Sequence, residues 1–177
     1  MPTYICLLRS INVSGTNIIK MADLKLFWTS LGFKNVATYI QSGNIIFESD
    51  TTPNASELEQ KIEEKFSTKN VSVIIKTPYE METILTNNPY TNLSDFDLKK
   101  MYVCYLQNIP ASKEIETFLD MNFGTDKFTV TNDVVYIYYR ESAGKSKLTN
   151  KVIEKALQTA STARNWNTTN KIVQLSK

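Results

Sequence analysis

The amino-acid sequence predicts an α+β protein of two ferredoxin-like βαββαβ units with antiparallel sheets, the second ending in an extra C-terminal helix. Over the first half of the 177 residues, apolar strand patterns alternate with amphipathic helix patterns in the order βαββαβ. The order begins again near residue 100. There Tyr102-Val-Cys-Tyr-Leu-Gln-Asn-Ile109 repeats the tyrosine, cysteine, leucine and isoleucine of Tyr4-Ile-Cys-Leu-Leu-Arg-Ser-Ile11 at the same spacing.

The first unit has a local reason for each element. Its expected strands are short apolar stretches bounded by polar or Gly-containing loops: 3–9, 36–41, 45–48 and 71–76. A helix over 21–31 has an apolar stripe and ends at Gly32. Ser42-Gly43-Asn44 forms a tight turn in a hairpin. Ser56 and Glu59 have the spacing of a capping box that opens the next helix.

The second unit is predicted in the same way. Its expected elements are a strand at 102–109, a helix near 115–119, a hairpin of 128–131 with 134–140, and a helix at 152–157. Asn132-Asp133 suits the two-residue turn of that hairpin. We expect the fourth strand to be replaced by the C-terminal helix around 169–175.

The domain boundaries are predicted from a break in the middle of the chain. A short connecting helix over 78–88 is broken at Asn88-Pro89. The following residues are polar. The predicted domains are therefore 1–88 and 100–177, with a linker over 89–99.

The residue types exclude several kinds of chemistry. The chain has no histidine, which removes Ser-His-Asp and Cys-His mechanisms and His-metal sites. Cys6 and Cys104 each lie inside an apolar strand pattern, which indicates buried structural thiols. We expect no metal and no cofactor. No pair of carboxylates has a convincing catalytic spacing, so an enzyme using carboxylate or lysine chemistry ranks last among the functional hypotheses.

The ends and the apolar runs of the sequence indicate a cytoplasmic protein without a membrane partner. No basic leader precedes an apolar run with a cleavage site, so no signal peptide is expected. No apolar run approaches the roughly 20 residues of a membrane span.

The charge is concentrated near the C-terminus. Residues 134–177 contain eight Lys and Arg but only Glu141 and Glu154 as acidic residues. Such a basic segment can attract phosphate, carboxylate or nucleic acid. The alternative is a solvated face rich in lysine.

A polar loop follows the first strand and is the first candidate site. Arg9 ends the strand, and an arginine fork suits phosphate or carboxylate. Asn12 and the other Asn and Gly residues of this loop tolerate left-handed backbone, which lets amides point at an anion. The second unit has Gln107 and Pro110 in place of Arg9 and Asn12, so the loop is an addition to the shared scaffold. The alternative is an arginine that pairs with an acidic residue at the domain interface.

The hairpin turn is the second candidate. Gln41, Ser42 and Asn44 could supply neutral hydrogen bonds to a ligand. A turn alone also explains these residue types.

Two basic segments complete the set. Gly144-Lys145-Ser146 follows a strand like the end of a phosphate-binding loop, but Tyr139 stands where the first glycine is needed. A looser anion site at a helix N-terminus, with Lys147, remains plausible. Arg164 and Asn165 beside Trp166 could clamp an anion or stack on a base. Trp166 could equally anchor the last helix.

Tyrosines 136, 138 and 139 raise the possibility of base stacking, as in the ferredoxin-like RNA-binding module. The glycine-aromatic signature of that module is absent. A tyrosine-rich central strand is more often part of a core.

The segments LLRSINVSG, TYIQSGNIIFES, GKSKLTN and TARNWNT together resemble the bacterial domain of unknown function 1697 family. The resemblance covers nearly the whole chain. The family pattern is closer to LLRGINVGG, so Ser10 and Ser14 stand where glycines are typical. The resemblance implies two ferredoxin-like α+β domains in a soluble bacterial protein, and it implies no activity.

The leading hypothesis is that an anionic, phosphate-bearing, nucleotide-like ligand binds in a cleft between the two domains. One alternative is sequence-tolerant RNA or DNA binding by the basic C-terminal quarter. Another is that the motifs only fasten the domains together. The predicted ligand-binding residues are Arg9, Asn12, Gln41, Ser42, Asn44, Lys145, Lys147, Arg164, Asn165 and Trp166.

Overall fold

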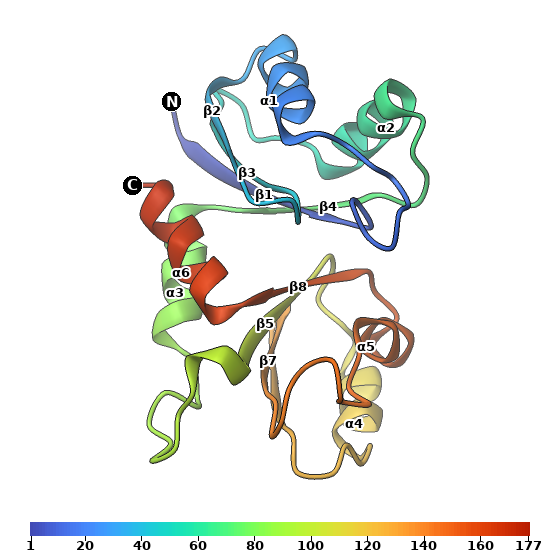
Figure 1. The fold of residues 1–177 in the computed structure, drawn as a ribbon, viewed down its shortest axis with the longest axis vertical. Helices are drawn as coiled ribbons and strands as arrows, with labels where there is room; N and C mark the ends of the chain where they lie inside the picture. The colour runs from blue at the N-terminus through green and yellow to red at the C-terminus, as the bar shows by residue number, and fades with distance from the viewer. The chain divides into compact units, whose positions relative to one another are not determined.

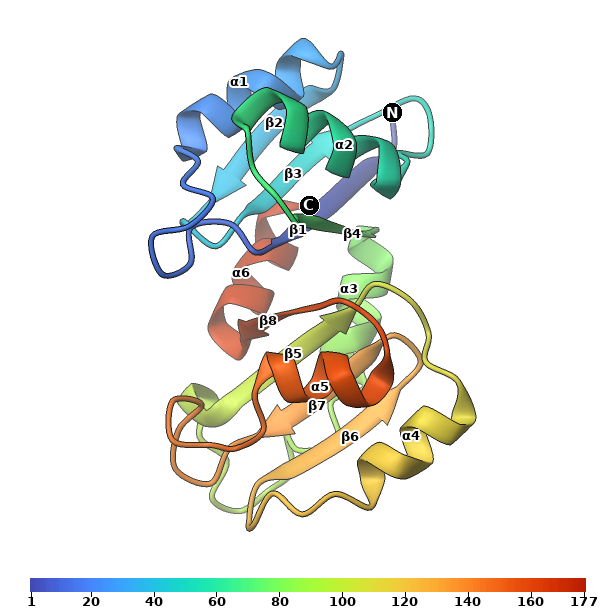
Figure 2. The ribbon, with the colours of Figure 1, turned by 90° about the vertical axis from the view of Figure 1, so that its right-hand side faces the viewer.

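The computed structural model describes residues 1–177, and its contacts divide the chain into two compact units. Unit 1 consists of Met1–Thr83 and Lys171–Lys177, and unit 2 of Ile84–Asn170. Each unit contains a four-stranded antiparallel sheet with two helices on one face (Figures 1 and 2). The predicted fold class is thereby confirmed. The predicted domains 1–88 and 100–177 have the same two-part order, and their bounds stay a prediction.

Unit 1 begins with a complete βαββαβ pattern. Its strands are β1 (Thr3–Arg9), β2 (Lys34–Tyr39), β3 (Asn44–Glu48) and β4 (Ser72–Lys76), and its helices are α1 (Met21–Ser30), α2 (Ala55–Phe66) and most of α3 (Pro78–Thr86). The sheet order is β2-β3-β1-β4. Because β1 is an interior strand, Cys6 lies opposite Ile45 on one side and Ile75 on the other.

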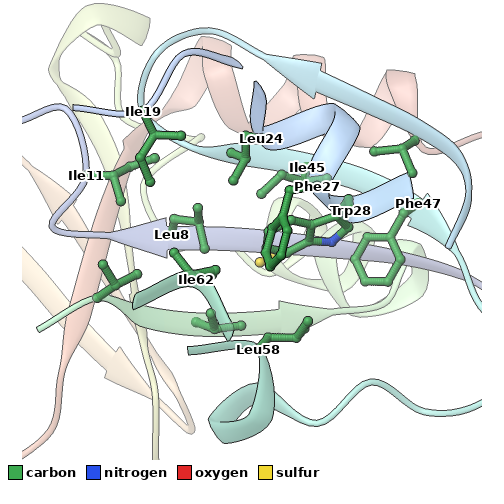
Figure 3. Close-up of a cluster of buried hydrophobic side chains, with 14 residues drawn as sticks. Leu8, Ile11, Ile19, Leu24, Phe27, Trp28, Ile45, Phe47, Leu58 and Ile62 are labelled. Atoms are coloured by element: carbon green, nitrogen blue, oxygen red, sulfur yellow. The ribbon is translucent and has the colours of Figure 1, made fainter. Parts of the chain in front are cut away.

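The core of unit 1 lies between the sheet and the helices α1 and α2 (Figure 3). The buried side chains from the helices include Leu24, Phe27, Trp28, Leu58 and Ile62, and those from the sheet include Leu8, Ile45 and Phe47. Each such aliphatic or aromatic side chain stabilises the fold by about 1.5–3 kcal/mol relative to exposure. The alternating strand positions therefore specify which face of the sheet receives the helices.

The N-terminus of α2 differs from the prediction. The side-chain oxygen of Asn54 accepts a hydrogen bond from the Glu57 amide at 3.0 Å, so Asn54 is the N-cap. The predicted capping box of Ser56 with Glu59 is wrong. Asn and Ser are equally good caps, and here the helix starts early enough to use the asparagine. Glu59 instead accepts a hydrogen bond from the Val73 amide at 2.8 Å, which ties α2 to β4.

Unit 2 repeats the topology. Its strands are β5 (Met101–Leu106), β6 (Lys127–Thr131), β7 (Val134–Tyr138) and β8 (Ser161–Asn165), and its helices are α4 (Ser112–Leu119), α5 (Asn150–Leu157) and the first half of α6 (Trp166–Leu175). A short 3-10 turn, η1 (Leu98–Lys100), precedes β5. The sheet order is β6-β7-β5-β8, with β5 in the place that β1 has in unit 1.

The fourth strand of unit 2 is a correction to the sequence analysis. The expectation that the C-terminal helix replaces this strand is wrong, because β8 pairs with β5 from Tyr102↔Asn165 to Leu106↔Ser161. The sequence STARN is polar and has no alternating apolar pattern. Its extended conformation depends on backbone hydrogen bonds that β5 supplies. The helix α6 then follows as the predicted extra C-terminal element.

The two units differ most in the lengths of two connections. Eleven residues (10–20) join β1 to α1, whereas five (107–111) join β5 to α4. Conversely, eleven residues (139–149) join β7 to α5, whereas six (49–54) join β3 to α2. Each unit thus carries one lengthened loop on the shared scaffold. No helix is both long and apolar enough to cross a bilayer.

The lengthened loop of unit 1 contains a miniature hairpin. The Asn12 amide donates to the Asn17 carbonyl at 3.1 Å, and the Thr16 amide donates to the Val13 carbonyl at 2.9 Å. The central residues Ser14 and Gly15 have φ of 49° and 77°. This is the left-handed backbone that two-residue hairpin turns of type I′ require. Ser14 therefore holds a conformation that favours glycine.

We predict that Ser14→Gly raises the free energy of unfolding by about 1 kcal/mol, since an L-residue pays a steric penalty in this region and glycine does not. The midpoint of urea unfolding measures the effect. Ser14→Ala removes the hydroxyl and keeps the Cβ, so it should give no gain. A destabilised glycine variant would contradict the prediction.

Candidate functional site

Arg9 lies at the end of β1 on the face of the sheet opposite α1 and α2. Its guanidinium donates to the Ser10 hydroxyl at 2.7 Å and to the Asn70 carbonyl at 3.3 Å. The second bond reaches the loop before β4. Within unit 1, Arg9 thus joins two loops at one end of the sheet.

Asn12 fastens the lengthened loop to the β2–β3 turn. Its side-chain amide donates to the Ile19 and Gln41 carbonyls, both at 3.0 Å, and its oxygen accepts from the Ile19 amide at 2.8 Å. Asn17 makes an equivalent connection to the loop before β4. Its amide group donates to the Ser10 and Lys69 carbonyls, and its oxygen accepts from the Lys69 amide. These hydrogen bonds of Asn12 are therefore structural.

The hairpin turn occupies residues 40–43 and ends one residue before the end of the predicted turn at 42–44. Asn44 already belongs to β3. The Asn44 side chain is fully buried and donates to the Tyr39 carbonyl at 2.8 Å and to the Ser42 hydroxyl at 3.0 Å. Gln41 has an exposed side chain, and its carbonyl receives the bond from Asn12. Of the three predicted ligand residues in this turn, only Gln41 extends its side chain into solvent.

Gly43 is required by a close approach. A Cβ at this position would lie 2.6 Å from Ile11 Cδ1 and 2.8 Å from Leu8 Cβ. Its φ of 78° adds a second reason. The turn therefore packs against the start of the lengthened loop, and the β2–β3 turn and the loop form one rigid end of unit 1.

Arg164 lies on β8, on the face of sheet β6-β7-β5-β8 that points away from α4 and α5. It is only 5% exposed and donates to the Thr162 hydroxyl at 2.7 Å and the Ala163 carbonyl at 2.9 Å. Asn165 caps α6, because its side-chain oxygen accepts from the Thr168 amide at 2.8 Å. Trp166 is buried at the first turn of that helix.

The tyrosines of β7 do not form an open platform for bases. Tyr136 is 1% exposed and donates to the Ile84 carbonyl at 2.8 Å. Tyr138 packs against the rings of Tyr90 and Phe96, and its hydroxyl donates to the Asp95 carbonyl at 2.9 Å. The segment before β5 thus covers this face, and the core interpretation of the tyrosines holds within unit 2.

Asp126 organises the lengthened loop of unit 2. One of its oxygens accepts from the Arg140 amide at 2.7 Å, and the other accepts from the Ser146 hydroxyl at 2.6 Å. The Ser146 hydroxyl in turn accepts from the Leu148 amide at 2.8 Å. The segment before β6 and the segment after β7 lie at the same end of the β6–β7 hairpin, because Lys127 pairs with Tyr138. The carboxylate of Asp126 therefore clamps the segment after β7 to the segment before β6.

A cavity of about 530 Å³ lies between these two segments. Its charged lining consists of Arg140, Lys145, Lys147, Asp126 and Glu141. Three cations against two carboxylates leave one positive charge in excess. The half-buried ring of Phe123 forms part of the wall. The volume lies within the range of about 300–1,000 Å³ that is typical of small-molecule sites.

The three cations are held to different degrees. Lys145 donates to Glu141 at 2.8 Å, and this bond lowers the pKa of the Glu141 carboxyl and raises the pKa of the Lys145 ammonium. Arg140 lies 3.6 Å from Asp95, with both side chains largely exposed. Lys147 is exposed, and no ion pair or hydrogen bond holds its ammonium. It is therefore the cation most available to a ligand.

The predicted anion site at a helix N-terminus differs from the observed arrangement, in which the two lysines lie on the loop before the helix. The helix α5 begins at Asn150, and the Thr149 hydroxyl accepts from the Val152 amide at 3.4 Å. The helix is thus capped by its own sequence. Lys145 and Lys147 line the cavity from the loop that precedes it. The lining does not include Arg164, Asn165 or Trp166.

Of the cavity residues, the predicted set contains only Lys145 and Lys147, and it lacks Phe123, Asp126 and Arg140 among others. A signal for them existed in the sequence. In a two-residue hairpin, the residues before the first strand lie beside those after the second. The predicted hairpin across Asn132-Asp133 therefore implied that the segments near 126 and 140 meet.

The cysteines provide no nucleophile. Both are buried, and neither forms a disulfide bond. Burial raises the pKa of the Cys104 thiol to about 12, so this thiol remains protonated at neutral pH.

We predict that a thiol reagent at pH 8 modifies neither Cys6 nor Cys104 in the folded protein and modifies both in guanidinium chloride. Rapid labelling of the folded protein would contradict their burial.

A second prediction concerns Asn12. Asn12→Ala should lower the free energy of unfolding by about 2–3 kcal/mol, because three hydrogen bonds are lost and alanine is disfavoured at φ 52°. Asn12→Asp keeps the acceptor for the Ile19 amide but turns a carboxylate oxygen toward the Ile19 and Gln41 carbonyls, so it should also lower the free energy of unfolding. Urea unfolding of both variants measures the difference, and an unchanged Asn12→Ala midpoint would show that the loop is not fastened by this side chain.

Comparisons with known proteins agree with this architecture. A solved structure of the conserved bacterial protein SP0830 from Streptococcus pneumoniae is similar, with a TM-score of 0.74 and 27% sequence identity over 99% of each chain. No curated protein matches the chain. The family model described as "Protein of unknown function (DUF1697)" matches residues 1–136, well over half of the chain, so the protein belongs to that family, as the sequence motifs indicated.

Proposed function

We propose that the protein binds a small phosphate-bearing anion in the cavity between the segments before β6 and after β7. The observation that carries this proposal is the exposed, unpaired ammonium of Lys147 in the wall of a cavity of about 530 Å³. Lys145 and Arg140 add two further cations to the same wall. Phosphate oxygens suit such a cluster because each accepts charge-assisted hydrogen bonds from ammonium and guanidinium groups.

The two carboxylates do not oppose this function equally. Both oxygens of Asp126 already accept hydrogen bonds from the loop, so Asp126 shapes the cavity. Glu141 pairs with Lys145 at the surface, where solvent screens an ion pair and leaves it weak. A ligand phosphate can therefore compete with Glu141 for the Lys145 ammonium at little cost.

The predicted cleft between the domains, with Arg9, Gln41 and Arg164 in its wall, stays a prediction. Within unit 1, Asn12 and Asn44 donate hydrogen bonds to backbone carbonyls, and Asn44 also donates to the Ser42 hydroxyl. The proposed cavity needs none of these residues. It therefore supports a ligand site even if the loop after β1 serves only the fold.

We expect Lys147→Ala to weaken binding of inorganic pyrophosphate by about threefold to fivefold, as measured by isothermal titration calorimetry at low salt. This is the contribution of one exposed charge-assisted contact. Lys155→Ala is the matched control, because Lys155 is an exposed lysine of α5 that does not line the cavity. The Lys155→Ala variant should bind pyrophosphate with the same affinity as the unaltered protein.

Two results would contradict the proposal. One is the absence of pyrophosphate binding by the unaltered protein at low salt. The other is an equal loss of affinity in Lys147→Ala and Lys155→Ala, which would indicate diffuse attraction by the basic C-terminal quarter. Tight binding of single-stranded RNA with a steep salt dependence would then favour the nucleic-acid alternative.

A further inference from the structure

We infer that the ligand of this cavity is a nucleoside monophosphate whose base stacks on the ring of Phe123, an inference that rests on the proposed function. Phe123 is the aromatic residue of the cavity wall and lies in the segment opposite the lysine loop. The phosphate of such a ligand would bind Lys147 on one wall, and its aromatic base would stack on Phe123 on the other.

The ring of Phe123 is held in place from its inner side. Its centroid lies 5.9 Å from that of Phe118 and 5.4 Å from that of Phe128. Phe118 is fully buried in the core of unit 2, and Phe123 itself is half-buried. The ring is therefore anchored by the core while part of its surface faces the cavity. A pre-positioned aromatic ring loses little freedom when a planar base packs against it.

The polar groups beside Phe123 suit the edge of a base. The Asn122 side-chain oxygen accepts from the Gly124 amide at 2.8 Å, which leaves its amide group as a donor. The Thr125 hydroxyl also lines the cavity and makes no hydrogen bond within the protein. Bases and riboses carry several acceptors, whereas the opposite wall carries cations. The cavity thus has one side with an aromatic ring and neutral polar groups, where Asp126 is the charged residue, and another side that carries the cations and Glu141.

This division favours a nucleotide over a sugar phosphate. A sugar phosphate would satisfy the cations but would leave the cavity face of Phe123 in contact with water. A nucleotide also covers that apolar surface, which stabilises the complex further. The free volume of about 530 Å³ suits a ligand of one nucleotide rather than a bare phosphate ion.

The decisive experiment compares AMP with ribose 5-phosphate, which has the same sugar and phosphate but no base. Calorimetry on the unaltered protein should show AMP binding about tenfold more tightly, the order expected for one base stacked on an aromatic side chain. In NMR spectra of AMP, the base protons should shift upfield and receive more saturation from the protein than the ribose protons.

Phe123→Leu removes the ring but keeps an apolar side chain against Phe118 and Phe128. In this variant AMP should bind no more tightly than ribose 5-phosphate, whose own affinity should be unchanged. Lys147→Ala should weaken both ligands by the same factor. The two ligands on the unaltered protein test the inference even if the leucine variant is unstable.

The outcomes separate this inference from the proposed function. Equal affinity for AMP and ribose 5-phosphate would overturn the stacking of a base and leave the phosphate site standing. If AMP, ribose 5-phosphate and pyrophosphate all fail to bind, both the inference and the proposed function are overturned. A preference for AMP that persists in folded Phe123→Leu would place the base elsewhere and overturn the role of Phe123.

Discussion

The double pairing of the strands β1 and β5 is the constraint on which the rest of the structure depends. Each strand has a hydrogen-bonded neighbour on both edges and apolar side chains on both faces, so it cannot present functional groups to a ligand along its length. Cys6 and Cys104 show the consequence, because both thiols are buried in the core. Polar and charged side chains are displaced to the ends of the strands. Arg9 stands at such an end, and so do the segments that form the cavity of unit 2.

The comparison of the two units shows where the scaffold was extended. Unit 1 lengthens the connection after β1 and ties it down with Asn12 and Asn17, so that the longer loop becomes part of the fold. Unit 2 lengthens the connection after β7, and Asp126 ties it down near Arg140 and Ser146. Exposed cations remain on this connection at Lys145 and Lys147. The same scaffold therefore supports one rigid loop and one loop with available charge.

The sequence was sufficient for the order of elements, because apolar alternation and helical stripes report which face is buried. It failed where a partner decides the conformation. The polar segment Ser161–Asn165 becomes β8 only because β5 supplies its hydrogen bonds. Asn and Ser are equally good N-cap residues, so the sequence alone does not decide between Asn54 and Ser56. Asn54 is the cap because the helix begins at Ala55. Lys145 and Lys147 were correctly placed on a loop, but the resemblance to a phosphate-binding loop pointed to the helix N-terminus. The clamp by Asp126, which depends on hairpin register, lies outside any local motif.

Energetic scale explains why an aromatic wall matters for this cavity. The cations lie near the surface, where each ion pair contributes about 0.2–1 kcal/mol and is screened by salt. Two or three such contacts give only weak affinity for a phosphate, since each factor of ten requires about 1.4 kcal/mol. One stacked base contributes about 1–3 kcal/mol and depends little on salt. In the proposed site, charge at Lys147 attracts and orients the ligand, and the base stacked on Phe123 supplies the selective affinity.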